Sequence, residues 1–291
     1  MTENLNTLPA ILKRNSIKFG EKPAFREKEF GIWQSWNWRE VHEHVNNMSL
    51  GLINLGIKEG EHICIIGRNR PHLYWSIIAA QNVGAIPTPL YQDSVAQEMI
   101  FPISHCSAKM AIVENQEQVD KLLEIKKDIT SLKNIIYLDP RGLRNYKKNN
   151  LYSLNDVFTL KNIENVSKLQ TELKNRQSKQ NLDTKSILLY TSGTTGRSKG
   201  VVLSNRNVIE SGKAGIVFDN INSDFSLICY LPMAWVGDFA FSMGLGLQSG
   251  MCICCPESSE TLHDDMREIG PSYFFGPPRF FESLLTSVNL K

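Results

Sequence analysis

Short apolar runs alternate with longer amphipathic stretches along most of the chain. Residues 61–67, 109–113 and 134–138 are apolar runs of strand length, and each is followed by a segment with apolar residues at helical spacing. Strands that read as nearly continuous apolar runs are typical of parallel sheets covered by helices on both faces. The pattern therefore predicts an α/β fold, in which alternating strands and helices form mostly parallel sheets flanked by helices.

Local signals refine this pattern. Asn37 and Glu40 form an N-x-x-E capping box before an amphipathic helix that Gly56 ends, and Pro71 is the expected first residue of another helix. Helices are expected near 5–12, 38–55, 71–80, 94–105, 116–127, from 205, up to about 247, at 260–269 and after 278. Strands are expected at 61–67, 85–89, 109–113, 134–138, 186–190, 200–203, 226–231, 251–255 and 272–275. Trp33, Trp36 and Trp38 alternate as in a half-exposed strand that enters a helix, which favours core packing.

One stretch interrupts the alternation. Residues 141–181 are rich in Asn, Lys and Gln with few apolar repeats, which predicts a polar connector of exposed helix and loop. We therefore expect two α/β sub-blocks of one domain, 1–180 (with the connector at about 141–181) and 182–291.

Composition narrows the class of protein. The 291 residues are 42% apolar and 21% charged, as in ordinary globular proteins, and 32 basic against 30 acidic residues give a net charge of +2. A net charge this close to zero gives no reason to expect nucleic-acid binding. The N-terminus lacks the pattern of a signal peptide and no apolar run is long enough to span a membrane, so the expected location is cytoplasmic.

The six cysteines form no CxxC pair, and we expect reduced thiols. Cys252, Cys254 and Cys255 are close enough in sequence to suggest a metal site, but no second Cys pair or HxxxH cluster accompanies them. A buried strand is the favoured interpretation.

The chemically informative stretch is Thr191–Gly200, which lies between two predicted strands. Its first six residues are all Gly, Ser or Thr, and Arg197 and Lys199 follow. Glycines let backbone N–H groups turn toward an oxyanion, hydroxyls add donors, and the cations add charge. The window 184–209 carries four basic residues and no acidic one, a local charge of +4. This composition indicates phosphate binding.

Other interpretations of this stretch are weaker. A Gly/Ser/Thr-rich run can be a plain surface loop, but the flanking strands and cations favour phosphate. The spacing from Gly193 to Gly196 is too short for a Walker A loop, and no G-x-G-x-x-G follows a strand. P-loop NTPases and Rossmann dehydrogenases are thus disfavoured.

Tyr190-Thr-Ser-Gly-Thr-Thr-Gly-Arg-Ser-Lys-Gly200 closely resembles the Y-T-S-G-T-T-G-x-P-K-G signature of AMP-forming acyl-adenylate ligases, with Ser198 in place of the usual Pro. The resemblance implies the fold of that superfamily's large N-terminal domain. It also implies that the loop grips ATP phosphates through a set of residues that comprises Thr191, Ser192, Gly193, Thr194, Thr195, Gly196 and Lys199. A hydroxyl of Thr191 or Thr194 is the candidate contact to Mg²⁺.

Two further segments indicate the long-chain fatty-acid–CoA ligase subgroup. Leu231-Pro-Met-Ala-Trp235 resembles the L-P-L-x-H segment at the acyl pocket, and Gly276-Pro-Pro-Arg279-Phe-Phe-Glu282 is similar to V-P-R-x-x-E. The implied acyl pocket residues are Trp235, Val236, Gly237 and Phe275. Core packing is an equally good interpretation of Trp235, and Asp238 is expected to cap the next helix.

The implied reaction has two steps. A fatty carboxylate attacks the α-phosphorus of ATP to give acyl-AMP and pyrophosphate, and the thiol of coenzyme A then displaces AMP. ATP, Mg²⁺ and coenzyme A are therefore the implied cofactors or co-substrates, and a fatty acid is the implied substrate. Peripheral membrane contact is left open, because such substrates partition into bilayers.

The family's downstream motifs are missing from the sequence. There is no Y-G-x-[ST]-E and no Thr-Gly-Asp, and the segment with the catalytic lysine is not recognised. We expect the second sub-block to be truncated, the C-terminal domain to be absent and the 291 residues alone to be inactive. The alternatives are a non-catalytic nucleotide- or partner-binding protein that needs a complementing chain, and a degraded gene product.

Overall fold

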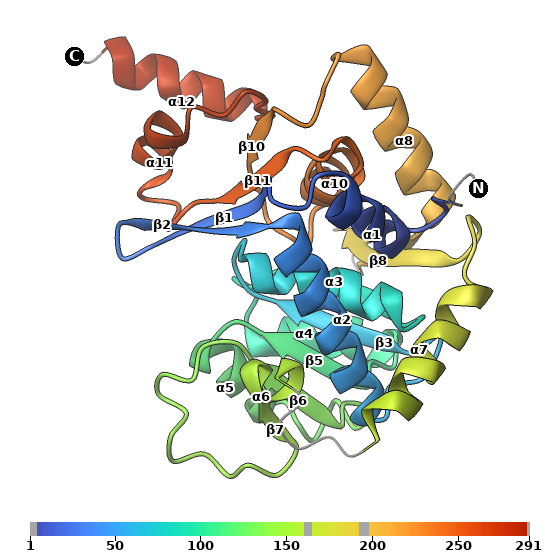
Figure 1. Cartoon of the computed structure of the whole chain (residues 1–291). Coiled ribbons are helices and arrows are strands. Elements are labelled where there is room, and N and C mark those ends of the chain that lie inside the picture. Colours follow the sequence, from blue (N-terminus) through green and yellow to red (C-terminus); the bar gives the residue numbers. More distant parts are fainter. Residues whose placement is uncertain (1–4, 160–164, 192–197, 290–291) are drawn as a thin grey trace.

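The largest sheet of the protein has five parallel strands (Figure 1). It is seen in a computed structural model that describes residues 5–159, 165–191 and 198–289. Its strands are β3 (His62–Ile66), β4 (Ile86–Leu90), β5 (Met110–Val113), β6 (Asn134–Tyr137) and β7 (Leu151–Ser153). They lie in the order β4-β3-β5-β6-β7, and every neighbouring pair is parallel. The predicted α/β class is confirmed.

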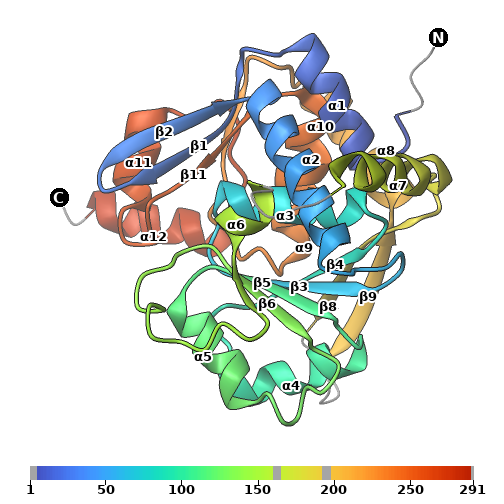
Figure 2. The ribbon, with the colours of Figure 1, turned by 60° about the horizontal axis from the view of Figure 1, so that its bottom comes forward.

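Helices cover both faces of this sheet (Figure 2). Ile63 and Ile65 of β3 join the apolar cluster formed with α2 (Trp38–Asn54) and α3 (Pro71–Asn82). Cys64 and Ile66, the alternate residues, join the cluster formed with α4 (Ala96–His105) and α5 (Gln116–Glu124). Because successive strand residues point to opposite faces, a strand buried on both sides reads as a continuous apolar run.

A second sheet combines strands from distant parts of the chain. It contains β1 (Pro23–Glu29), β2 (Ile32–Asn37), β10 (Ser226–Ile228) and β11 (Cys252–Cys255), in the order β10-β11-β1-β2. Only the β1–β2 hairpin within it is antiparallel. The sequence predicted neither β1 nor its pairing with β11. All four residues of β11 are buried, which confirms the interpretation of this cysteine-rich segment as a strand.

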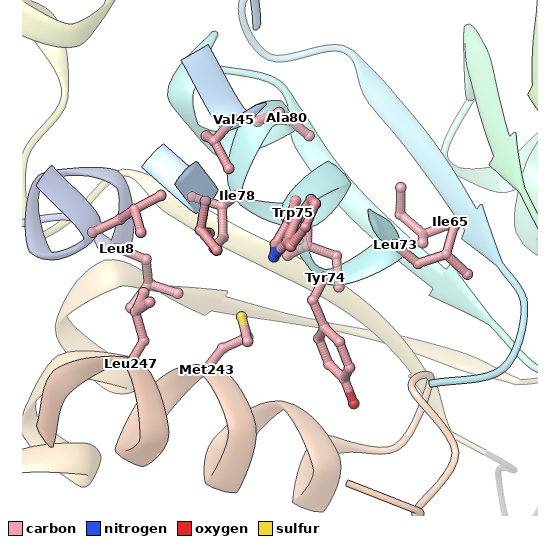
Figure 3. Close-up of a cluster of buried hydrophobic side chains, with 14 of the residues drawn as sticks. Leu8, Val45, Ile65, Leu73, Tyr74, Trp75, Ile78, Ala80, Met243 and Leu247 are labelled. Atoms are coloured by element: carbon pink, nitrogen blue, oxygen red, sulfur yellow. The ribbon is translucent and has the colours of Figure 1, made fainter. Parts of the chain in front are cut away.

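The helical layer beside both sheets joins the N-terminus to the last third of the chain. Its elements are α1 (Leu8–Lys18), α2, α8 (Asn205–Phe218), α9 (Val236–Phe239), the π-helix η1 (Ala240–Gly246) and α10 (Leu247–Ser249). Leu8 of α1, Met243 of η1 and Leu247 of α10 meet Ile78 of α3 in one apolar core (Figure 3). The Asn15 side chain donates to the Leu247 carbonyl at 2.6 Å. The predicted Asn37–Glu40 capping box is present at the start of α2.

The segment expected to be a polar connector contributes to the main sheet, which corrects that expectation in part. It contains β7, α6 (Leu154–Phe158) and α7 (Val166–Lys179), and Leu151, Leu154 and Leu173 are buried. Most of its remaining described residues are exposed. The buried Arg176 donates to the Ile57 and Val83 carbonyls at 3.0 and 3.3 Å. Helix α7 is thus held against the domain partly by hydrogen bonds from a polar side chain. Because such a residue adds nothing to an apolar pattern, the sequence did not indicate that this helix packs on the domain.

Other elements also differ from the expected pattern. Residues 272–275 were expected to form a strand, but they make a single parallel bridge, Leu227 to Tyr273. Helix α11 (Leu262–Ile269) precedes this segment and helix α12 (Pro278–Asn289) follows it, both as predicted. Within the described residues, no helix combines the length and apolar character required to cross a membrane.

Candidate functional site

The predicted phosphate loop is the connection of an antiparallel hairpin. Strand β8 (Lys185–Thr191) leads into it and β9 (Lys199–Ser204) leaves it, with Thr191 paired to Lys199. Both of these residues are exposed. Five predicted phosphate contacts, namely Ser192, Gly193, Thr194, Thr195 and Gly196, lie outside the described residues. The hairpin thus brings the first and last predicted contacts side by side at the mouth of the loop.

The hairpin register separates the cations that the sequence grouped together. Lys185 pairs with Ser204 at the end of the hairpin away from the loop. Lys185 and Thr191 are six residue steps apart along β8, a rise of about 20 Å. Arg206 donates to the Asp183 carboxylate at 2.9 Å, so its charge is matched by an acid just outside the basic window. The local charge of +4 is therefore not concentrated at the loop, which corrects that interpretation; Lys199 stands at its mouth.

Tyr190 anchors the loop end of β8 to α4. Its hydroxyl donates to the Pro102 carbonyl at 3.1 Å and lies 2.8 Å from Nδ1 of His105. Burial raises the pKa of Tyr190, so the phenol stays neutral. A cavity of about 450 Å³ lies beside it, lined in part by Tyr91, Glu98 and Ser198. Sequence reasoning placed Tyr190 in the motif but did not identify this anchoring role.

The structure brings two of the predicted acyl pocket residues together. The ring centroids of Trp235 and Phe275 are 6.4 Å apart, and Phe275 stacks on Phe241 at 4.0 Å. A Cβ on Gly237 would lie 2.8 Å from the Trp235 ring, so glycine leaves room for the ring to fold over this position. Val236 is 46% exposed and points to solvent. The sequence analysis did not single out Phe241, six residues after Trp235.

The backbone around this aromatic group is held by Tyr230, which lies two residues after β10. The Tyr230 hydroxyl donates to the Phe275 carbonyl at 3.1 Å, and the Tyr230 ring stacks on Phe274 at 5.5 Å. These contacts keep 273–275 beside the segment that carries Trp235, although 273–275 form no regular strand. A smaller cavity of about 110 Å³ adjoins Tyr230 and Asn69.

Asp238 has a different position from the one expected. It lies inside α9 and makes no capping hydrogen bond, because Trp235 occupies the N-cap position. Its side chain is 3% exposed and accepts from the Tyr74 hydroxyl at 2.8 and 2.9 Å. Burial raises the pKa of Asp238 to about 7, against the effect of the hydrogen bonds from Tyr74 and Asn69.

Candidate metal ligands are few in the described residues. No group of three or more His, Cys, Asp or Glu side chains there could hold a metal ion. Thr191 offers an exposed hydroxyl at the mouth of the loop, and Thr194 lies outside the described residues. The role of either threonine toward Mg²⁺ stays a prediction.

The family model described as AMP-binding enzyme matches residues 12–291, a span that contains both the β8–β9 hairpin and the Trp235 segment. The chain belongs to this family. The match confirms the resemblance that the Tyr190–Gly200 motif indicated.

Curated relatives of this AMP-binding chain are long-chain fatty-acid–CoA ligases. It is 26% identical over 280 residues to long-chain-fatty-acid–CoA ligase ACSBG1 of Rattus norvegicus, which covers 94% of the chain and 38% of the relative. It is 27% identical over 290 residues to ACSBG2 of Homo sapiens, which covers 97% of the chain and 42% of the relative. The chain thus spans about two fifths of the length of these relatives.

Solved structures share the fold of this family member at low identity. A long-chain-fatty-acid–CoA ligase (FadD1) from Archaeoglobus fulgidus superposes with a TM-score of 0.81 at 20% identity, covering 100% of this chain and 55% of that one. The anthranilate CoA ligase AuaEII in complex with anthranoyl-AMP gives 0.77 at 16% identity, covering 95% and 50%. Both confirm the expected fold.

Proposed function

We propose that the chain is the phosphate- and acid-binding part of an AMP-forming long-chain fatty-acid–CoA ligase. In this function a fatty carboxylate attacks the α-phosphorus of ATP, giving acyl-AMP and pyrophosphate. The thiol of coenzyme A then attacks the acyl carbon, forming the thioester and releasing AMP. ATP, coenzyme A and a fatty acid are the proposed small-molecule substrates.

The observation that carries the proposal is the pairing of Thr191 with Lys199 across the mouth of a Gly/Ser/Thr loop. A triphosphate in this position would meet loop donors and one ammonium group together. Such an arrangement suits the first step, because negative charge moves onto the leaving pyrophosphate. The aromatic group of Trp235, Phe241 and Phe275 is the proposed contact for the acyl chain.

Mg²⁺ is proposed as the ion that accompanies ATP. It binds oxygen ligands and usually keeps several waters while bridging substrate phosphates, so a site with a single threonine hydroxyl suits it. The exposed hydroxyl of Thr191 fits that requirement. When bound, the ion would neutralise part of the phosphate charge.

We further propose that these 291 residues do not form acyl-CoA alone. The sequence contains neither Y-G-x-[ST]-E nor Thr-Gly-Asp, and the curated relatives are more than twice as long. A complementing chain is then the proposed partner. A cytoplasmic location with peripheral membrane contact is proposed with it.

One observation favours the alternative of a partner-binding protein. Helix α12 exposes a row of apolar side chains, with Phe281 at 50%, Leu285 at 61% and Val288 at 64% exposure. An amphipathic helix normally buries such a face. A monodisperse, cooperatively melting monomer in light scattering would argue against a required partner.

The phosphate assignment is tested by binding of Mg-ATP to the purified chain in isothermal titration calorimetry. Lys199→Ala should weaken binding about tenfold or more, because it removes a charge-assisted contact to phosphate. Lys185→Ala is the matched control, since Lys185 is an exposed lysine of the same hairpin at the end away from the loop. Equal affinities of the two variants would refute the loop assignment.

A second experiment separates binding from catalysis. Fatty-acid-dependent exchange of pyrophosphate into ATP, measured on the chain alone, should be undetectable. Detectable exchange would overturn the proposal that the chain is inactive by itself.

A further inference from the structure

Three polar side chains, the half-buried Asn69 and the buried Tyr74 and Asp238, connect the start of α3 to the segment that carries Trp235. Asn69 Nδ2 lies 2.9 Å from the Leu231 carbonyl, 3.1 Å from Oδ1 of Asp238 and 2.7 Å from the Tyr74 hydroxyl. Asn69 follows β3, and Tyr74 lies in α3. The two ends of the segment Leu231–Asp238 are thus bound to one asparagine side chain.

Tyr74 is the third member of this network and hydrogen-bonds to both Asn69 and Asp238. Figure 3 shows its ring leaving the apolar cluster on the side opposite Leu8. Its hydroxyl reaches both oxygens of the Asp238 carboxylate, and the Tyr74 side chain is fully buried. The hydroxyl accepts from Asn69 while it donates to Asp238, so each of the three side chains contacts the other two.

The network contains the carboxyl group of Asp238, whose burial does not by itself favour the folded state. Within the described part of the chain, no Lys or Arg forms an ion pair with Asp238. A buried carboxyl without a cation is costly, even where hydrogen bonds satisfy it. The local backbone helps to keep it in place, since the Ser242 hydroxyl donates to the Asp238 carbonyl at 2.6 Å.

The titratable groups that face Asp238 come from three elements. They are Tyr74 of α3, Cys229 directly after β10, and Cys255 of β11. Burial is the largest cause of the raised pKa of each, and the negative charge of Asp238 adds to it. These three groups therefore stay protonated around neutral pH, where Asp238 titrates.

We propose that Asp238 is a positioning residue, which together with Asn69 and Tyr74 holds the segment Leu231–Asp238 and hence the Trp235 ring at the acyl site. The charged carboxylate accepts from both Tyr74 and Asn69, which fastens the segment. The protonated acid uses one oxygen as a donor and loosens this arrangement. The acyl part of this inference rests on the proposed function.

The positioning role is tested by ¹⁹F NMR of the chain labelled with 5-fluorotryptophan, between pH 5 and 9. Trp235→Phe identifies the resonance of Trp235 among the five tryptophans. In the native chain this resonance should shift with a midpoint near pH 7. Asp238→Asn should abolish the shift, and Tyr74→Phe should move the midpoint upward, because the lost hydroxyl stabilised the charged form.

The control is Asp265→Asn, which changes another fully buried aspartate, located on α11. It should leave the Trp235 midpoint unchanged. A Trp235 resonance that does not titrate in the native chain, or that titrates equally in Asp238→Asn, overturns the positioning role. If Asp238→Asn does not fold, the midpoint of Tyr74→Phe decides, and an unchanged midpoint overturns it.

The acyl part has a separate readout, the binding of cis-parinaric acid followed by its fluorescence. Asp238→Asn should weaken binding about three- to tenfold at pH 8, where native Asp238 is charged, and have little effect at pH 6, where an amide resembles the protonated acid. If the native chain does not bind the probe, the proposed acyl site fails while the NMR titration still decides the positioning role. Equal affinities of native and variant at pH 8 overturn the acyl part alone.

Discussion

Nδ1 of His105 and the hydroxyl oxygen of Tyr190 lie 2.8 Å apart, although 85 positions separate them in the sequence. The Tyr190 hydroxyl also donates to Pro102, so this side chain joins the phosphate-loop hairpin to α4 by two hydrogen bonds. These two hydrogen bonds fix the end of β8, and hence the described mouth of the loop, relative to the helix that follows β4.

Tyr190→Phe should lower the free energy of unfolding by about 1 kcal/mol, because it removes the hydroxyl's hydrogen bonds to the Pro102 carbonyl, which keeps its bond from the Cys106 amide, and to the exposed His105 ring. Urea denaturation followed by circular dichroism measures this change. Tyr91→Phe is the control for loss of a hydroxyl, since Tyr91 is 41% exposed and should change stability much less. Equal effects of the two substitutions would contradict the anchoring role.

Asp265→Asn should destabilise the protein by about 2 kcal/mol. Asp265 is fully buried and accepts from Lys28 at 2.9 Å, from the Glu257 amide and from the Thr261 hydroxyl. The neighbouring Asp264→Asn removes only an exposed ion pair with Arg267 and should cost less than about 1 kcal/mol. Thermal unfolding of both variants checks the difference, and a larger loss for Asp264→Asn would disprove it.

The lowered pKa of His72 should make the free energy of unfolding depend on pH. Burial, and secondarily His44, lowers the pKa of His72 to about 4, below the ordinary value of 6.5. The unfolded chain therefore binds more protons between pH 6.5 and 4, and stability should fall as the pH is lowered through that range by up to about 1.4 kcal/mol per unit. His72→Phe should flatten this slope in urea titrations at several pH values. A slope that persists unchanged in the variant would assign it to other groups.

Gly237→Ala should displace the Trp235 ring, because the added Cβ would lie 2.8 Å from it. The half-buried ring can swing away, so the stability loss should stay below about 1 kcal/mol, while the near-ultraviolet circular dichroism of the tryptophan changes. Gly244→Ala is the matched control, since its Cβ would have only ordinary contacts of 3.6 Å or more. An unaltered spectrum in Gly237→Ala would contradict the close approach.

Elements with strong local signals were predicted correctly. The β3, β5 and β6 strands follow from apolar runs, and the start of α2 follows from Asn37 and Glu40, because these signals act over a few residues. The alternation of Trp33 and Trp36 indicated β2 before α2, but β1 and its hairpin with β2 were missed, since β1 carries charged residues among its apolar ones. Its buried Lys28 is satisfied by Asp265, which lies 237 positions away.

In the candidate site, too, features with a local sequence signal were predicted and those that depend on distant contacts were not. The motif from Tyr190 to Gly200 identified the loop, its cation Lys199 and the family, because a short run of small residues near a charge is itself the phosphate-binding device. The role of Asp238 could not be derived in this way. Its partners Asn69 and Tyr74 lie 169 and 164 positions away, and a lone aspartate before an apolar run indicates a helix cap more readily than a buried network.

The sequence by itself determined the α/β class, most elements of the parallel sheet, the phosphate-loop motif and the family, because each depends on residue type and short-range periodicity. The tertiary structure alone decided that Lys185 stands at the hairpin end away from the loop, that Tyr190 is anchored on α4, that Trp235 meets Phe275, and that Asp238 is buried. Strand register and burial set these distances. Both arise from packing between segments that are distant in the sequence, such as Trp235 and Phe275, 40 positions apart, or Asp238 and Tyr74, 164 positions apart, which local patterns do not encode.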